Sequence, residues 1–229
     1  MKDIHSHILP CVDDGSSSID ESISLIKMLR EQGIDDVSAT PHYIANRDSL
    51  SDFLSKRSEA FDKIKAEASE YISKIRLGAE VAYYPGISRL DGLCDLLIEG
   101  SNLLLLEMPV SVWSDYMVQE IINMSSSGSF VLVIAHAERY IDLQRKNIKN
   151  LIYSSDILIQ SNAAFFINLS TRRKALKLLN DGYINFLGSD CHNTKTRPPK
   201  IGEAYSLIEN KLGNPFLKKI NDFSKVFIK

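Results

Sequence analysis

The chain has 229 residues, of which 44% are hydrophobic and 24% are charged, so it is long enough for one large globular domain with a sizeable core. Its formal net charge of −2 provides no basic field and argues against nucleic acid as a partner. No apolar run is long enough for a signal peptide or for a membrane span, and we therefore expect a cytoplasmic protein without membrane insertion.

Short β-type runs alternate with longer helical patterns along the whole chain. An early helix should end at Gly33, and a longer one reaching Ala68 should have Asp48 or Ser49 as its N-cap. Strands are predicted near residues 2–6, 36–40, 75–80, 103–107, 130–135, 156–160 and 184–189. Further helices are predicted near residues 88–99, 114–126, 141–153, 172–181 and 202–212.

This alternation predicts an α/β fold with a parallel sheet, because parallel strands need crossover connections. A closed, barrel-like arrangement of seven strands is the first choice for its architecture. An open doubly wound sheet is the second choice, although the glycine-rich first turn of a dinucleotide-binding fold is missing. No repeat or long linker divides the sequence, so residues 1–229 are expected to form a single domain.

All histidines of the sequence lie at or just past the C-terminal end of a predicted strand, and three acidic residues do the same. The histidines are His5, His7, His42, His136 and His192, and the acids are Glu80, Glu107 and Asp190. A lone histidine is more often an ordinary hydrogen-bonded residue than a ligand, but independent accidents would scatter five of them over helices and loops. Because the C-terminal ends of barrel strands converge on one face, these side chains are expected to share one bowl.

The pair His5 and His7 is spaced for metal binding, because side chains at i and i+2 of a strand share a face. The loop that follows offers the carboxylates of Asp13 and Asp14. Mixed nitrogen and oxygen ligands suit Mn²⁺, Fe²⁺ or Zn²⁺, whereas the three cysteines are widely spaced and form no thiolate-rich site.

Six short motifs occur in a fixed order from residue 3 to about residue 199. They are D-x-H-S-H at 3–7, A-T-P-H at 39–42, G-A-E at 78–80, L-L-E-M-P at 105–109, H-A-E-R at 136–139 and G-S-D-C-H-N at 188–193. Together they resemble the polymerase-and-histidinol-phosphatase (PHP) superfamily. The opening I-H-S-H-I-L-P-C-V-D-D-G is especially similar to its bacterial tyrosine-phosphatase branch, which is associated with capsule and exopolysaccharide synthesis.

The resemblance implies a distorted seven-stranded, TIM-like (β/α)7 barrel that holds three divalent metal ions, usually Mn²⁺. The implied ligands are His5, His7, Glu80 and Asp190 for the first ion, Glu80, Glu107 and His136 for the second, and Asp14, His42 and His192 for the third. The acids at positions 14 and 107, where many other superfamily members have histidine, favour the tyrosine-phosphatase branch.

Arg139 and Arg197 match the phosphate-binding arginines of that branch, and His42 is a candidate for assisting the leaving group. Two positions depart from the family pattern. Ala137 replaces the proline of H-P-E-R, and Cys191 stands where a small residue such as alanine is common. Neither departure removes an implied ligand.

The activity implied is the metal-dependent hydrolysis of phosphotyrosine on a protein, with a membrane-associated bacterial tyrosine kinase as the usual partner. A PHP phosphoesterase that acts on a small phosphate monoester, such as histidinol phosphate, is the alternative, because the same metal site would serve it. A non-catalytic, metal-stabilised binding domain ranks lower, because it predicts a broken ligand set and every implied ligand is present.

A rival motif lies in the same segment, because Cys191 and Arg197 also match the C-x5-R pattern of cysteine-dependent tyrosine phosphatases. The intervening residues contain no glycine and two prolines follow, which disfavours a phosphate-cradling loop. We interpret the match as a coincidence.

A C-terminal stripe has helical spacing and is surrounded by lysines. Its residues are Phe216, Ile220, Phe223 and Phe227. Such a stripe most often packs a terminal helix on the core, and contact with a partner or a membrane surface is the alternative.

Overall fold

The computed structural model describes residues 1–154 and 156–228. Strands and helices alternate in it, and the strand pairings of the described residues are parallel. One sheet has the order β1 (Lys2–Ser6), β2 (Asp36–Ala39) and β4 (Lys74–Leu77). The other has the order β3 (His42–Tyr43), β5 (Glu80–Ala82), β6 (Leu103–Glu107), β7 (Val131–Ile134), β8 (Leu158–Asn162) and β9 (Phe186–Gly188). The predicted parallel α/β class is therefore confirmed.

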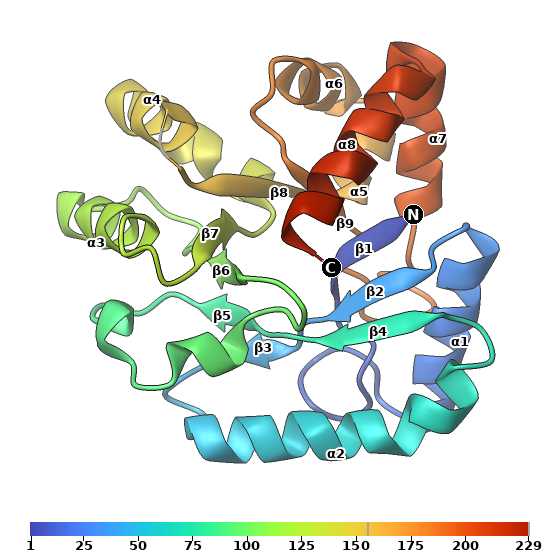
Figure 1. The fold of residues 1–229 in the computed structure, drawn as a ribbon. Helices are drawn as coiled ribbons and strands as arrows, with labels where there is room; N and C mark the ends of the chain where they lie inside the picture. The colour runs from blue at the N-terminus through green and yellow to red at the C-terminus, as the bar shows by residue number, and fades with distance from the viewer. Residues whose placement is uncertain (155, 229) are drawn as a thin grey trace.

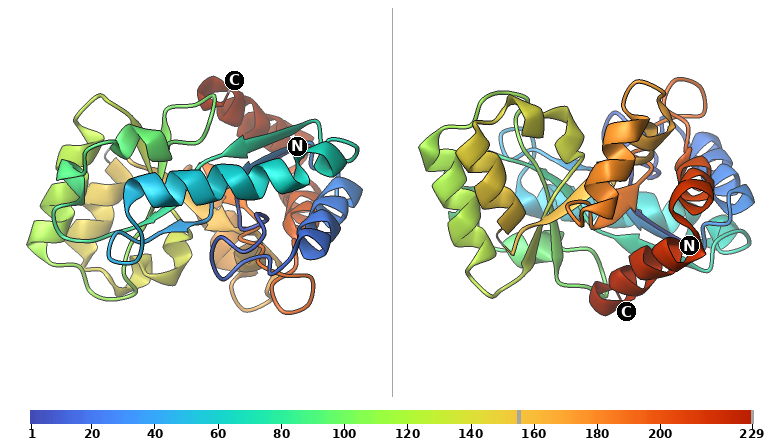
Figure 2. Two further views of the ribbon diagram at one scale, coloured as in Figure 1. Left: turned by 90° about the horizontal axis from the view of Figure 1, so that it is seen from below. Right: turned by 90° about the horizontal axis from the view of Figure 1, so that it is seen from above.

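Helices surround the two sheets (Figure 1). They are α1 (Ile19–Glu31), α2 (Leu50–Ala68), α3 (Asp115–Ser125), α4 (Lys146–Ser154), α5 (Ala163–Ile167), α6 (Arg172–Asn180), α7 (Ile201–Leu212) and α8 (Asn214–Phe227). Short 3-10 turns cover Ile87–Arg89, Leu93–Leu96, Ala137–Arg139 and Ile141–Leu143. Figure 2 shows α2 crossing the outer side of the strands, and α3 beside α4 at the opposite end of the molecule from α7.

The ends of the first two helices follow from their capping residues. Ser18 caps α1 by accepting a hydrogen bond from the N–H of Glu21, and Ser49 caps α2 by accepting one from the N–H of Asp52. Gly33 follows the last turn of α1 with a φ of 76°, a left-handed conformation that glycine adopts without a steric cost. The predicted N-cap Ser49 and the stop at Gly33 are thus confirmed.

Three predicted elements differ from the structure. The strand expected over 75–80 is divided into β4 and β5, and β3 was not predicted. The helix expected over 88–99 is replaced by two 3-10 turns, because Gly86 and Gly92 introduce positive φ angles of 92° and 81°. The helix expected over 141–153 begins as a 3-10 turn before α4. The single seven-stranded barrel is not confirmed, since the strands of the described residues form a three-stranded and a six-stranded sheet.

An apolar cluster forms a floor between the strands. Leu103 and Leu105 of β6 and Leu158 of β8 contribute to it. Side chains alternate between the two faces of a strand, so Glu107 continues the face of Leu105 at the C-terminal end of β6. Gln160 continues the face of Leu158 in the same way. The strands therefore carry polar side chains directly above an apolar floor.

The C-terminal helix packs on this framework. The rings of Phe227 and Phe186 have centroids 6.1 Å apart, and the Lys2 ammonium group donates a hydrogen bond to the carbonyl oxygen of Ile228. The two termini accordingly lie close together (Figure 1). Packing of the stripe is confirmed for Phe216, Ile220 and Phe227, whereas the side chain of Phe223 lies outside the described residues. Among the residues that the structure describes, no helix is long and apolar enough to cross a membrane.

Candidate metal centre

The predicted site residues meet in one cluster. Glu107 ends its strand as expected, whereas His42 and Glu80 are the first residues of β3 and β5 and not the last residues of the predicted strands. The ring centroid of His7 lies 3.9 Å from that of His192 and 4.6 Å from that of His42. The rings of His5 and His136 are 5.6 Å apart on the other side of the cluster. The expectation that all five histidines share one bowl is therefore borne out by their positions.

The first group of potential ligands consists of His5, His7 and Asp190. The Nε2 atoms of His5 and His7 lie 3.1 Å apart and are 3.1 Å and 3.2 Å from Oε2 of Glu80. The Oδ1 atom of Asp190 is 3.8 Å from Nε2 of His5 and 3.6 Å from Nε2 of His7. His5, His7 and Asp190 thus form one group of potential ligands, and Glu80 adjoins both of its histidines.

The second group consists of His42, Glu80 and Glu107. His136 adjoins it, because its Nε2 atom is 2.7 Å from Oε1 of Glu80 and 3.3 Å from Oε1 of Glu107. The Nδ1 atom of His42 is 3.1 Å from Oε2 of Glu80. Glu80 consequently has Oε2 toward His5 and His7 and Oε1 toward His136.

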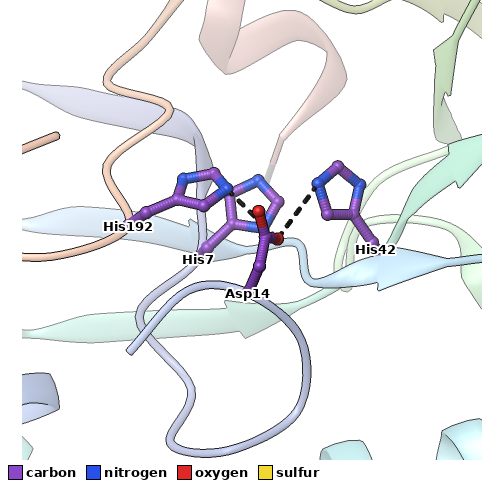
Figure 3. A group of neighbouring side chains, drawn as sticks. All are labelled: His7, Asp14, His42 and His192. Atoms are coloured by element: carbon purple, nitrogen blue, oxygen red, sulfur yellow. Dashed lines mark ion pairs between the residues drawn. The ribbon is translucent and has the colours of Figure 1, made fainter. Parts of the chain in front are cut away.

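The third group consists of His7, Asp14, His42 and His192 (Figure 3). The Oδ1 atom of Asp14 lies 3.5 Å from Nε2 of both His42 and His192. The side chain of Asp14 is 67% exposed, whereas that of His192 is 1% exposed. Asp14 therefore closes the group from the solvent side. His7 and His42 each belong to two groups, a sharing that the sequence did not predict.

Local backbone geometry brings these side chains together. The parallel register places His42 directly opposite Glu80 on the neighbouring strand. The loop that carries Asp14 passes so close to the strand that a Cβ atom on Gly15 would lie 2.4 Å from the carbonyl oxygen of His7. His136 and Asp190 adopt positive φ angles of 28° and 51°. Such strained backbone at non-glycine residues is concentrated at functional sites.

Asp13 supports the cluster without belonging to any of the three groups. Its Oδ2 atom lies 2.6 Å from Nδ1 of His7 and accepts the backbone N–H of His42 at 2.8 Å, and its Oδ1 atom accepts the N–H of Gly15. A carboxylate behind a ligand histidine fixes its ring orientation. The sequence offered Asp13 only as one of two adjacent acids in the loop.

Gln160 and Asn162 are neighbours of the ligands that the sequence did not suggest. Both are buried and project from the same face of β8. Gln160 contacts His5 and the backbone of His136, and Asn162 donates to Asp190. The available signal was two polar residues spaced i and i+2 near the end of a strand, as in the pair His5 and His7.

Neighbouring carboxylates change the acidity of the buried histidines. Burial alone lowers the pKa of His7, but its hydrogen bonds and attraction to Asp13 and Glu80 outweigh burial and raise that pKa to about 10. The pKa of His136 is raised to about 9 in the same way, by Glu107 and Glu80 against the effect of burial. These rings therefore lie in a negative field that favours bound cations.

The pKa values of His192 and Asp190 are lowered instead. Burial lowers the pKa of His192 to about 4, with help from the charges of His7 and Arg197. Burial raises the pKa of Asp190, but attraction to His5 and His7 lowers it well below its ordinary value. The cluster thus combines ionised carboxylates with a histidine that remains neutral, the form that a metal requires.

The donor atoms of the cluster fit divalent metal ions. Glu80 Oε2, His42 Nδ1 and His192 Nε2 are buried atoms that make no hydrogen bond of good geometry. Leaving such an atom unsatisfied costs about 1–3 kcal/mol. His5 and His7 also turn their Nε2 atoms toward the same carboxylate oxygen. Nitrogen and carboxylate donors aimed at common points are the coordination that Mn²⁺, Fe²⁺ or Zn²⁺ prefers.

Two arginines meet at the mouth of the cluster. Arg139 contacts Oδ2 of Asp190, and Nη2 of Arg197 donates to Oδ1 of the same carboxylate at 2.8 Å. Each arginine side chain is 38% exposed. The two guanidinium groups therefore flank one carboxylate and also face solvent, next to the candidate metal groups.

The segment from Cys191 to Arg197 lacks the features of a cysteine-phosphatase loop. Cys191 is buried, and burial raises the pKa of its thiol far above the ordinary value, whereas a nucleophilic cysteine needs a lowered pKa. The backbone N–H groups of residues 195–197 donate to Oδ1 of Asn193 and do not converge on an open cradle. The interpretation of the C-x5-R match as a coincidence agrees with this geometry.

The family model described as capsular polysaccharide synthesis, CpsB/CapC, matches residues 1–224. Tyrosine-protein phosphatase YwqE of Bacillus subtilis (strain 168) is 29% identical over 224 residues, covering 93% of this chain and 86% of the relative. Tyrosine-protein phosphatase CpsB of Streptococcus agalactiae serotype V is 27% identical over 232 residues, covering 93% of this chain and 91% of the relative.

The fold also has a relative among solved structures. This solved structure comes from work on YwqE from Bacillus subtilis and CpsB from Streptococcus pneumoniae, which are described as unique metal-dependent tyrosine phosphatases. The match has a TM-score of 0.85 and covers 100% of this chain and 94% of that chain, at 24% sequence identity. The arrangement of parallel strands and surrounding helices is thus shared along the whole chain.

Proposed function

This chain belongs to the CpsB/CapC family of capsular polysaccharide synthesis, and we propose that it is a metal-dependent protein-tyrosine phosphatase. The printed names of its relatives, tyrosine-protein phosphatases YwqE and CpsB, support this activity. The structural relative described as metal-dependent has the same fold. We assign the metal role to the three groups of histidine and carboxylate side chains in the candidate metal centre.

The observation that carries the proposal is the position of Arg139 and Arg197. Both guanidinium groups reach the carboxylate of Asp190, and both remain open to solvent at the mouth of the cluster. Arginine pairs bind phosphate through parallel, charge-assisted hydrogen bonds. A phosphate monoester would therefore bind with its oxygens toward these arginines, above the metal groups.

The proposed ions are three Mn²⁺, with Fe²⁺ or Zn²⁺ as the alternatives. When bound, they would supply Lewis acidity toward the phosphoryl oxygens and lower the pKa of water toward neutrality. The residues of the chain itself set the charge of the site. The positive charge of three divalent ions would exceed the negative charge of the four carboxylates of Asp14, Glu80, Glu107 and Asp190. A phosphate dianion would therefore enter a positive environment.

The tyrosyl leaving group needs little protonation by the protein. A tyrosyl oxygen has a pKa of about 10 and needs less protonation than an alkyl alcohol. His42 lies at the open side of the cluster, with its side chain 18% exposed, and is our candidate for assisting its departure. That role, and the assignment of each ligand to a particular ion, stay predictions.

The proposed substrate and partner rest on the family to which the chain belongs. A tyrosine-phosphorylated protein is the proposed substrate, and we expect a membrane-associated bacterial tyrosine kinase of capsule or exopolysaccharide synthesis to be the partner. The cytoplasmic location and the single-domain organisation of residues 1–229 stay predictions.

We further infer that the two sheets together make the distorted seven-stranded barrel. The segment after β9 hydrogen-bonds to β1, since the N–H of Asp190 donates to His5 and the N–H of His7 donates to Cys191, both at 2.9 Å. At the other junction, the N–H of Gly78 donates to Ala39 at 2.9 Å, which keeps the divided strands in line. Counting β2 with β3 and β4 with β5 as two broken strands gives the expected number of seven.

Substrate profiling tests the proposed activity. We expect hydrolysis of a phosphotyrosine peptide at a kcat/KM at least tenfold above that for the same peptide with phosphoserine. Histidinol phosphate and nucleoside monophosphates serve as small-molecule competitors. If histidinol phosphate proves the better substrate, the chain is a small-molecule phosphoesterase and the protein-phosphatase assignment is wrong.

A further inference from the structure

Gln160 and Asn162 form a buried amide pair beneath the candidate metal centre. Both project from the inner face of β8, and they are 0% and 6% exposed. Gly188 on the neighbouring strand leaves room for them, because a Cβ atom there would lie 2.7 Å from Nε2 of Gln160 and 2.6 Å from Cβ of His5. Only glycine at position 188 of β9 therefore leaves space for the uncharged side chain of Gln160 beside His5.

The orientation of the Gln160 amide is determined by its partners. The backbone N–H of His136 lies 2.7 Å from Oε1 of Gln160, and a backbone N–H can only donate. The atom facing His136 must therefore be the amide oxygen. The same oxygen is 3.1 Å from Nδ1 of His5, so that this ring nitrogen carries the hydrogen. The lone pair of His5 is thereby left on Nε2, the atom that points at Glu80.

The orientation of the Asn162 amide follows from that of Gln160. Because Oε1 of Gln160 accepts from His136 and His5, the Nε2 atom of Gln160 donates to Oδ1 of Asn162 at 2.9 Å. Asn162 must then present Nδ2 to Oδ2 of Asp190, at 2.6 Å. The other oxygen of Asp190 faces His5 and His7. A single chain of hydrogen bonds, started by a backbone N–H, thus orients a histidine and a carboxylate of the same group.

We propose that Gln160 and Asn162 are positioning residues of the first metal group, in which Gln160 holds His5 in the tautomer with hydrogen on Nδ1 and Asn162 orients Asp190. The inference rests on the metal site of the proposed function and is independent of the substrate. Partners behind metal ligands commonly change metal affinity by 10- to 100-fold when they are removed. A neutral amide suits this position, because it supplies an acceptor to His5 and a donor toward Asp190 at once.

Three variants separate the two roles. Gln160→Met has nearly the same shape without acceptor or donor, and Gln160→Glu keeps acceptor oxygens for His136 and His5. Asn162→Ala leaves the contact with His5 intact and removes the donor to Asp190. Gln119→Met is the matched control, since Gln119 lies on the surface of α3 and hydrogen-bonds only to Asn123 among the contacts of its side chain that the structure describes.

Two measurements do not depend on catalysis. The tautomer of His5 is read from the ring nitrogens of the metal-free protein by long-range ¹H–¹⁵N NMR, which is practical with five histidines. The affinity for Mn²⁺ is read from the EPR signal of free Mn²⁺ during titration. Circular dichroism first establishes that each variant is folded.

We expect Gln160→Met to lose the Nδ1–H form of His5 and to bind at least one of its Mn²⁺ ions about tenfold or more less tightly. Gln160→Glu should keep that tautomer, and Asn162→Ala should keep it while weakening Mn²⁺ binding. An unchanged tautomer and an affinity within twofold of the parent in Gln160→Met would overturn the proposal, as would equal losses in Gln160→Met and Gln160→Glu. Failure of the phosphatase assignment alone would leave both measurements unaffected.

Discussion

The carboxylate of Asp13 lies 2.6 Å from Nδ1 of His7, a histidine whose Nε2 atom takes part in the first group of potential ligands. The same carboxylate accepts the backbone N–H of His42. One acid thus supports two histidines that each belong to two groups. Asp13 belongs to none of the three groups, so we expect it to influence a bound ion through these histidines.

Replacing Asp13 by asparagine should weaken Mn²⁺ binding by about tenfold or more, because the charge-assisted bond to His7 is lost. Calorimetric titration with Mn²⁺ measures the change. Asp62→Asn is the matched control, since Asp62 is exposed on α2. Equal affinity in both variants would show that Asp13 does not position His7.

Replacing Arg139 by alanine should leave the metal content unchanged and lower kcat/KM by about 100-fold, the usual cost of losing a group that stabilises transition-state charge. Elemental analysis and steady-state kinetics give the two values. Arg145→Ala provides the control, because Arg145 follows in the same segment and pairs with the exposed Asp115. Normal turnover of Arg139→Ala would remove this residue from the phosphate site.

Glu120 anchors the loop that follows β5 and thereby the end of the strand that carries Glu80. It is buried and accepts hydrogen bonds from the hydroxyls of Tyr83 and Ser88, both at 2.8 Å, and from the N–H of Gly86. Burial raises the pKa of Glu120, but these hydrogen bonds lower it below its ordinary value of 4.5. The ionised form is therefore preferred in the folded protein.

Glu120→Gln should lower the free energy of unfolding by about 2 kcal/mol at neutral pH, since hydrogen bonds to a charged group are lost. Because the folded pKa is the lower one, this contribution is complete above the ordinary value of 4.5 and disappears as the pH falls through the folded value. Urea unfolding of both proteins at pH 7 and pH 4 measures it. A difference that grows on acidification would contradict the prediction.

The position of the site was predictable because parallel strands present their C-terminal ends together. Glu107 ends β6, and Asp190 and His192 follow β9, as expected. The helix expected over 88–99 was wrong, because the spacing of Leu93 and Leu96 imitates a helix while Gly92 allows the chain to turn. Apolar spacing alone does not distinguish an α-helix from short turns that bury the same side chains.

The finer details of the site depend on tertiary contacts. The sharing of His7 and His42 between groups arises from where the loop places Asp14, which a strand pattern does not specify. Gln160 and Asn162 were missed because amides are rarely metal ligands and their role appears only when β8 lies beside His5. Sequence therefore identified residues with ligand chemistry better than residues that orient them.

The most direct test of the central claim compares the activity of the parent protein and Cys191→Ser on a phosphotyrosine peptide, before and after chelation and with Mn²⁺ restored. We predict that both proteins lose activity with the chelator and recover it with Mn²⁺, because the metal groups and not the buried thiol carry the chemistry. Activity that resists the chelator and vanishes in Cys191→Ser would contradict the metal-dependent mechanism and favour a cysteine nucleophile.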